Sequence, residues 1–261
     1  MDCSASSLLS PMLNRLNGYG NNGNDTPIRG EDIADRVTND DFLSYLPNSS
    51  NPAIIEPPGK RQHITHNELH RFLTQDFDLV QFGIGHGCRV GVILPNGPEL
   101  AVCIVGTISR WCAAPINSTN TFNEVKSELQ STKARAIIVL ANNEDSIMAA
   151  TELSLGIIVL NPSLEKSGLF TLTLLMPPPV DALTIGHSYI PPQPGFLSYH
   201  HPEIVLLLHT SGTSGNKKCV PYSLDMLLVG VGCIIASWNL RSKSILRIFI
   251  FNYAFFNAIL K

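Results

Sequence analysis

Residues 206–220 read Leu-Leu-Leu-His-Thr-Ser-Gly-Thr-Ser-Gly-Asn-Lys-Lys-Cys-Val. An aliphatic run ends there in small hydroxylated residues, two glycines and two lysines, and a long apolar segment follows. The pattern predicts a strand, a glycine-rich loop and a helix. Glycine lets the backbone approach a ligand closely, successive N–H groups form a concavity that binds anions, and a following helix adds its positive end. We therefore expect the loop to bind a phosphate chain.

The spacing within this loop separates it from other glycine-rich loops. Gly212 and Gly215 are three residues apart, and neither Lys217 nor Lys218 is followed by Ser or Thr. A Walker A loop needs four residues between its first Gly and a Gly-Lys-Ser/Thr end. A flexible Ser/Gly linker is the alternative interpretation. It is disfavoured because the loop lies directly between an aliphatic strand and a helix.

The chain before the loop alternates between aliphatic runs and helical patterns. Continuous apolar runs of four or five residues occur at 90–94, 113–116, 136–140, 156–160 and 204–208. Such runs, separated by helices of about 10–15 residues, indicate a parallel sheet that is covered on both faces. The sequence therefore predicts an α/β fold, with a mostly parallel sheet and helices on both faces.

The starts of the helices are marked by capping residues. Thr65 and Thr121 each precede a Glu by three residues, which is the capping box that begins a helix. Asn96 is expected to cap a third helix, with Pro98 in its first turn and an end near Trp111. A fourth helix is expected over 143–154.

The composition argues against several functional classes. The chain has 261 residues, of which 44% are hydrophobic and 15% charged, and this is enough for a sizeable core. Its net charge of −3 gives no support for nucleic-acid binding. Residues 226–238 are apolar but short and interrupted by glycine, so a membrane is not an expected partner.

The cysteines and the C-terminal residues bear on location. The six cysteines contain no Cys-x-x-Cys pair and are expected to be reduced thiols in a reducing compartment. We therefore expect a cytoplasmic protein. A peroxisomal location stays open, although the chain does not end in Ser-Lys-Leu.

Three histidines, His63, His66 and His70, raise the question of a zinc site. His63 precedes the helix that Thr65 caps, and no Cys or acidic ligand joins the three at a suitable spacing. We expect solvated histidines here, and the sequence predicts no metal site.

Residues 210–220 resemble the phosphate-binding signature of the adenylate-forming superfamily, which contains acyl-CoA synthetases, luciferases and adenylation domains of nonribosomal peptide synthetases. The usual pattern is Thr-Ser-Gly-Thr-Thr-Gly-x-Pro-Lys-Gly-Val. Lys217 stands where the family has Pro, and Cys219 stands where it has Gly. A side chain at 219 would restrict the loop's exit if a positive φ is needed there. Ile64-Thr-His-Asn-Glu-Leu69 and Pro115-Ile-Asn117 are similar to two earlier family motifs.

The resemblance implies the N-terminal portion of the large domain of an adenylate-forming enzyme. In that family a carboxylate attacks the α-phosphate of Mg-ATP, which gives an acyl-adenylate and pyrophosphate. A thiol of coenzyme A or phosphopantetheine then takes the acyl group. ATP and Mg²⁺ are thus the implied cofactors, and a small carboxylate is the implied substrate. The oligomeric state and the catalytic residues are left unassigned.

The resemblance also assigns residues to the phosphates. Hydroxyl groups and close backbone approach would bind the β- and γ-phosphate oxygens, and a lysine would add a mobile positive charge. Lys217 is expected to be solvated. The residues so assigned are Thr210, Ser211, Gly212, Thr213, Ser214, Gly215 and Lys218.

The sequence divides into three expected parts. Residues 1–50 would be a flexible N-terminal extension and 51–240 a partial AMP-binding domain, within which the proline-rich stretch 161–203 would be irregular. Residues 241–261 are basic and aromatic and form a tail unlike the family.

Several groups that the family uses are not found after the loop. These are a magnesium-binding Glu, a ribose-binding Asp and a catalytic Lys. We therefore expect a truncated chain that does not form acyl-adenylate by itself. The alternatives to ATP-dependent carboxylate activation are a non-catalytic fragment, or a protein that docks on a membrane or partner through its basic, aromatic tail.

Overall fold

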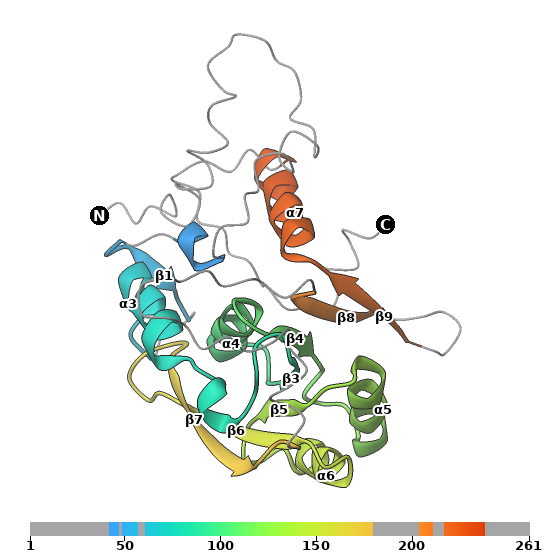
Figure 1. Cartoon of the computed structure of the whole chain (residues 1–261). Coiled ribbons are helices and arrows are strands. Elements are labelled where there is room, and N and C mark those ends of the chain that lie inside the picture. The colour runs from blue at the N-terminus through green and yellow to red at the C-terminus, as the bar shows by residue number, and fades with distance from the viewer. Residues whose placement is uncertain (1–41, 47–48, 57–60, 180–203, 211–216, 238–261) are drawn as a thin grey trace.

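The computed structural model describes residues 42–46, 49–56, 61–179, 204–210 and 217–237 (Figure 1). Within these residues lies a seven-stranded sheet with the order β7-β6-β5-β3-β4-β8-β9. The strands are β3 (Arg89–Ile93), β4 (Cys112–Pro115), β5 (Ala136–Val139), β6 (Gly156–Pro162), β7 (Phe170–Met176), β8 (Leu206–Thr210) and β9 (Lys218–Tyr222). The five inner strands are parallel, and the edge strands β7 and β9 are antiparallel to their neighbours. The predicted α/β fold with a mostly parallel sheet is confirmed.

Helices cover both faces of this sheet. They are α3 (His66–Arg71), α4 (Pro98–Ile108), α5 (Phe122–Thr132), α6 (Glu144–Glu152) and α7 (Leu224–Ser237). Figure 1 shows α3 and α4 on one side of the sheet and α5 and α6 on the other. Successive strand residues point to opposite faces, so Val92 and Ile138 join the core under α4, whereas Ile93 and Ile137 pack with α5 and α6.

The capping residues decide where the helices begin. The capping boxes at Thr65 and Thr121 are both present, as predicted, and each is worth about 1 kcal/mol. The expected cap at Asn96 is wrong, because Gly97 holds the cap position without a side-chain hydrogen bond. Pro98 is the first residue of α4, where its fixed φ starts the helix and its missing N–H costs nothing. This helix ends at Ile108, earlier than expected.

The stretch expected to be irregular contains a strand. β6 continues to Pro162, and β7 pairs with it antiparallel, with Leu160 opposite Leu172 and Val159 opposite Thr173. The sequence of β7, Phe-Thr-Leu-Thr-Leu-Leu-Met, carries the apolar and β-branched residues that favour strands. The prolines that follow it hid this signal. Residues 180–203 lie outside the described residues.

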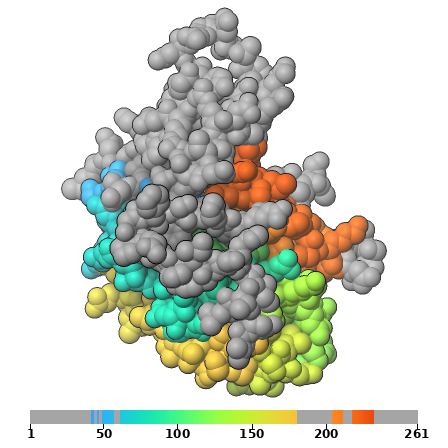
Figure 2. Space-filling model, in the orientation of Figure 1, coloured from blue at the N-terminus to red at the C-terminus, as the bar shows by residue number. Residues whose placement is uncertain are grey.

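Smaller elements complete the described chain. A two-stranded antiparallel sheet and three short helical turns precede β3. They are β1 (Pro52–Ile54), β2 (Ile64–Thr65), η2 (Phe42–Tyr45), η3 (Phe72–Asp76) and η4 (Val80–Phe82). Figure 2 shows the cyan, green and yellow residues as one rounded body, with the orange β8, β9 and α7 at its side. Among the helices within the described ranges, none has the length and apolar character that crossing a bilayer requires.

Candidate functional site

The carboxyl ends of the parallel strands meet at one edge of the sheet. From β3 the chain crosses through α4 to β4, then returns through α5 past β3 to β5. Ligands of such open sheets bind at the carboxyl edge, where the winding direction reverses. A hollow of about 540 Å³ lies at this edge, lined by residues that follow β3, β4 and β5 and by the start of α6. It marks the face on which a ligand is expected.

The glycine-rich loop leaves the sheet at this same edge. β8 runs parallel to β4, so Thr210 ends β8 on the carboxyl side. The chain then returns as β9, in which Lys218 lies opposite Thr210 and Cys219 opposite His209. The predicted connection of a strand to a helix is therefore wrong: the loop joins two antiparallel strands, and α7 begins only at Leu224.

The sequence of β9 explains this difference. Val220 favours a strand, and Pro221 lacks the N–H that a helix interior needs. A proline is tolerated in an edge strand such as β9. Cys219 lies in paired strand, so the predicted conflict between its side chain and a positive φ does not arise.

The predicted phosphate-binding residues fall into two groups. Thr210 and Lys218 are described, and they face each other across the base of the hairpin, with Thr210 Oγ1 3.5 Å from the carbonyl oxygen of Lys218. Lys218 is exposed. The remaining predicted residues lie outside the described residues: Ser211, Gly212, Thr213, Ser214 and Gly215. The position of the hairpin at the carboxyl edge agrees with a phosphate site, and the individual contacts stay predictions.

A buried carboxylate beside the loop was not foreseen from the sequence. Glu128 of α5 is only 3% exposed. Its Oε1 accepts hydrogen bonds from Lys217 Nζ at 2.5 Å and from Asn120 Nδ2 at 3.1 Å. Lys217 is exposed, as expected, with 40% of its side chain accessible, but its ammonium group also forms an ion pair with a buried partner that the sequence did not indicate.

His209 is the second buried polar group at the loop. Its Nδ1 lies 3.5 Å from Glu128 Oε2, and its Nε2 lies 2.8 Å from the hydroxyl oxygen of Ser131. Burial lowers the pKa of His209 most, Glu128 opposes this shift, and Lys217 adds to it. We infer that burial decides the balance, so His209 is neutral near pH 7.

One sequence signal could have revealed this network. The buried side of α5 carries Val125, Leu129 and Thr132, which are spaced as one helical face. Glu128 lies on this same face, where an acidic residue is costly unless it is paired. A carboxylate within an apolar stripe therefore indicates a buried partner, although it does not identify Lys217 or His209.

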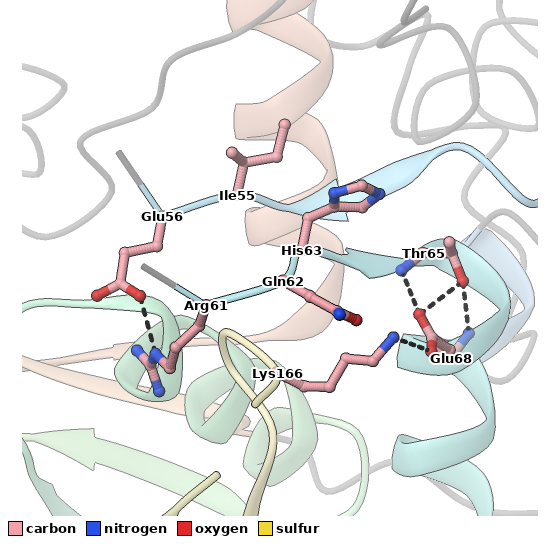
Figure 3. Close-up of a pocket in the computed structure, with 8 residues that line it drawn as sticks. All are labelled: Ile55, Glu56, Arg61, Gln62, His63, Thr65, Glu68 and Lys166. Atoms are coloured by element: carbon pink, nitrogen blue, oxygen red, sulfur yellow. Dashed lines mark hydrogen bonds and ion pairs between the residues drawn. The ribbon is translucent and has the colours of Figure 1, made fainter. Parts of the chain in front are cut away.

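A second hollow, of about 630 Å³, lies beside β1 and β2 (Figure 3). Arg61 at its wall donates to Glu56 at 2.8 Å and to Glu99 at 2.6 Å, and both carboxylates raise the pKa of the guanidinium. Lys166 donates to Glu68 at 2.8 Å, which together with the Thr65 backbone lowers the pKa of Glu68 to about 2. Because these charges are paired within the wall, we assign them to holding β1 and β2 onto α4.

The three histidines near α3 differ in exposure. His63 is exposed and His70 half-buried, but His66 is only 1% exposed, and both of its ring nitrogens lack a hydrogen-bond partner. The expectation that all three are solvated is therefore wrong for His66. The helix explains this, since His66 and Leu69 are spaced to point inward together.

Acidification from pH 7.5 to 5.5 is expected to lower the free energy of unfolding by about 1–3 kcal/mol. Burial is the main cause that lowers the pKa of His66, His86 and His209 below 6.5. The unfolded chain then binds protons that the folded chain does not, so stability is lost as the pH falls through about 6.5. The pKa of Glu68 is about 2, so its contribution to the free energy of unfolding is lost only below pH 4.5.

Urea unfolding at the two pH values measures this effect. Replacing His66 by leucine should remove part of the pH dependence, because it removes one buried titrating group. Replacing the exposed His63 by glutamine should leave the dependence as it is. Equal stability at pH 7.5 and 5.5 would contradict the assignment of neutral, buried histidines.

Comparison with known proteins identifies the family. Residues 47–254 match the family described as AMP-binding enzyme. The chain belongs to the AMP-binding enzyme family. The matched range extends past residue 240, and the predicted division at 50 and 240 stays a prediction.

Curated relatives of this AMP-binding chain are ligases. Acyl-CoA synthetase ALT10 of Alternaria alternata is 27% identical over 223 residues, which are 78% of this chain and 38% of the relative. Probable CoA ligase CCL9 of Humulus lupulus is 29% identical over 161 residues, which are 61% of this chain and 29% of the relative. The chain thus spans about two fifths or less of the length of these relatives.

Solved structures agree on the fold. Apo MatB from Rhodopseudomonas palustris matches with a TM-score of 0.56 and 20% identity, over 78% of this chain and 38% of MatB. The long-chain-fatty-acid-CoA ligase FadD1 from Archaeoglobus fulgidus matches with a TM-score of 0.54 and 16% identity, over 80% of this chain and 40% of FadD1. At these identities the likeness shows the fold alone.

Proposed function

We propose that this AMP-binding chain supplies the ATP phosphate-binding part of an enzyme that activates a carboxylate. The observation that carries the proposal is the place of the hairpin: Thr210 and Lys218 flank a glycine-rich loop at the carboxyl end of parallel strand β8. The family and the ligase relatives support the same activity. ATP-bound MatB, a structure of the same fold with a TM-score of 0.56, adds a nucleotide-bound neighbour.

The proposed reaction has two steps. A carboxylate oxygen attacks the α-phosphorus of ATP, the bond to the β-phosphate oxygen breaks, and acyl-adenylate and pyrophosphate form. A thiol, of coenzyme A or of phosphopantetheine, then attacks the acyl carbon and releases AMP. The loop would stabilise the negative charge that gathers on the leaving pyrophosphate. In this role Lys218 supplies a mobile cation, and Thr210 supplies a hydroxyl donor.

Magnesium is implied by this chemistry, and the carboxylate at the loop does not fit it. Glu128 is buried, and its Oε1 already accepts from Lys217 and Asn120, whereas Mg²⁺ needs a wet octahedral site of oxygen ligands. We therefore derive no step through a metal ion bound by Glu128.

A cytoplasmic location remains part of the proposal.

Lys218→Ala is expected to weaken ATP binding by about tenfold or more, since one charge-assisted contact to phosphate is worth about 1.5–3 kcal/mol. Titration calorimetry with ATP on the 261-residue chain measures the dissociation constant. Arg71→Ala is the matched control, because Arg71 is also an exposed cation but belongs to α3, which lies away from the β8–β9 hairpin (Figure 1). Equal affinities of Lys218→Ala and the unaltered chain would refute the phosphate role of the loop.

A further inference from the structure

One buried carboxylate meets both ends of the glycine-rich loop. Glu128 Oε1 accepts from Lys217, the residue before Lys218, at 2.5 Å. Glu128 Oε2 lies 3.5 Å from Nδ1 of His209, the residue before Thr210, and neither of these two buried atoms has a hydrogen-bond partner among the described residues. The two residues that enter and leave the loop thus contact the same side chain of α5. Since Thr210 and Lys218 face each other in the ladder, this side chain lies where it can set their position.

We propose that Glu128 is a positioning residue for nucleotide binding, which fixes both ends of the loop against α5. The inference rests on the proposed function, because it assigns a second residue to the same phosphate site. The partner of Glu128 is specific to this chain, since Lys217 stands where the family pattern usually has proline.

The surroundings of Glu128 hold its carboxylate in one orientation. Asn120 Nδ2 donates to Oε1 at 3.1 Å, next to the ammonium group of Lys217. Ser131, one turn further along α5, contacts the far nitrogen of His209 at 2.8 Å. The side chains of Glu128 and His209 are 4% and 1% exposed, so water has little access to the carboxylate and the imidazole, whereas the Lys217 side chain is 40% exposed. A network with buried members such as Glu128 and His209 holds these two side chains in place more firmly than an ion pair exposed on both sides does.

A change at Glu128 that raises the affinity for ATP and one that lowers it have different causes, so the direction of the change distinguishes positioning from simple electrostatics. Glu128 carries a negative charge close to a site proposed for an anion, so its removal alone would strengthen ATP binding. A positioning role predicts the opposite. Glutamine keeps the shape of the side chain but has one acceptor oxygen, and its NH₂ group must then face either Lys217 or His209. With the NH₂ group toward Lys217, the ammonium group loses its acceptor, and with it toward His209, the close approach of Oε2 to Nδ1 is altered.

Glu128→Gln is expected to weaken ATP binding by about fivefold to tenfold, as measured by calorimetric titration with ATP on the 261-residue chain. Glu152→Gln is the matched control. It removes the exposed ion pair between Glu152 and Lys126, which joins the same helix α5 to α6, and should leave the affinity within about twofold of the unaltered chain. Circular dichroism at the titration temperature must show both variants folded. Unchanged or tighter ATP binding by folded Glu128→Gln would overturn the proposal.

A double-mutant cycle tests whether Lys217 and Glu128 act as one unit. Lys217→Met should weaken ATP binding, and Lys217→Arg, which keeps a cation for Glu128, should retain more affinity. The double variant Glu128→Gln with Lys217→Met should be no weaker than Lys217→Met alone, because the contact is already lost. Fully additive losses would mean that Lys217 meets the nucleotide independently of Glu128, which contradicts the proposal.

Amide hydrogen exchange provides a readout that needs no nucleotide. If Glu128 fixes the loop ends, Glu128→Gln should speed exchange of the amides of His209, Lys218 and Cys219 by about tenfold relative to Glu152→Gln. Equal exchange in the two variants would refute the positioning role even if the chain binds no ATP. Faster exchange without ATP binding would instead uphold the positioning of these residues and refute the proposed function.

Discussion

Replacing Trp111 by alanine is expected to lower the free energy of unfolding by about 3–5 kcal/mol. Trp111 is fully buried. Its ring meets Phe77 edge-on, with centroids 6.0 Å apart, and its Nε1 donates to the carbonyl oxygen of Ile84 at 3.1 Å. Alanine would leave a large cavity and an unpaired carbonyl group. Urea unfolding followed by circular dichroism measures the loss.

Trp111→Phe divides this loss into its two causes. Phenylalanine keeps most of the packing against Phe77 but cannot donate to Ile84, so we expect a smaller loss of about 1–3 kcal/mol. If Trp111→Ala and Trp111→Phe lower the free energy of unfolding equally, the cavity is not the main cause of the loss. A cost below about 1 kcal/mol for Trp111→Ala would contradict the buried position of this side chain.

Arg61→Met is expected to lower the free energy of unfolding by about 2–3 kcal/mol. The guanidinium donates to Glu56, to Glu99 and to the carbonyl oxygen of Ser163, and thereby joins three segments of the chain. Figure 3 shows the bond to Glu56. Methionine keeps much of the apolar stem but leaves Glu99, 15% exposed, without its cation. Urea unfolding at pH 7.5 measures the change.

Lys126→Met is the control for this variant. Lys126 also forms an ion pair, with Glu152, but this pair is more exposed, at 29% and 53% of the two side chains. Its loss should cost no more than about 0.5 kcal/mol. If the two variants cost the same, the network around Arg61 does not stabilise the fold beyond an ordinary surface pair.

Much of the fold followed from local sequence patterns. The aliphatic runs at 136–140 and 156–160 became β5 and β6, and the capping boxes at Thr65 and Thr121 start helices where expected. These features depend on hydrophobic periodicity and on hydrogen bonds within four residues, so the chain alone specifies them. The family resemblance was likewise a matter of residue order in the loop.

Two strands, β7 and β9, depend on the strand that lies beside each of them in the sheet. β7 was missed because its pattern is short and next to prolines, and it exists through pairing with β6. The sequence predicts a helix directly after the loop, although Pro221 indicates otherwise, and only pairing with β8 makes β9 a strand. Strand formation needs a partner whose position a single sequence does not give.

The residues assigned to the phosphate loop could be named from the sequence, because glycine, hydroxyl and lysine at fixed spacing suffice for that chemistry. The sequence also determined the α/β class and the alternating strands and helices. Only the tertiary structure brought Glu128 to Lys217 and His209, residues 89 and 81 positions away along the chain. Side chains of α5 and of the β8–β9 hairpin meet at Glu128, and a buried charge is stable only when it is paired.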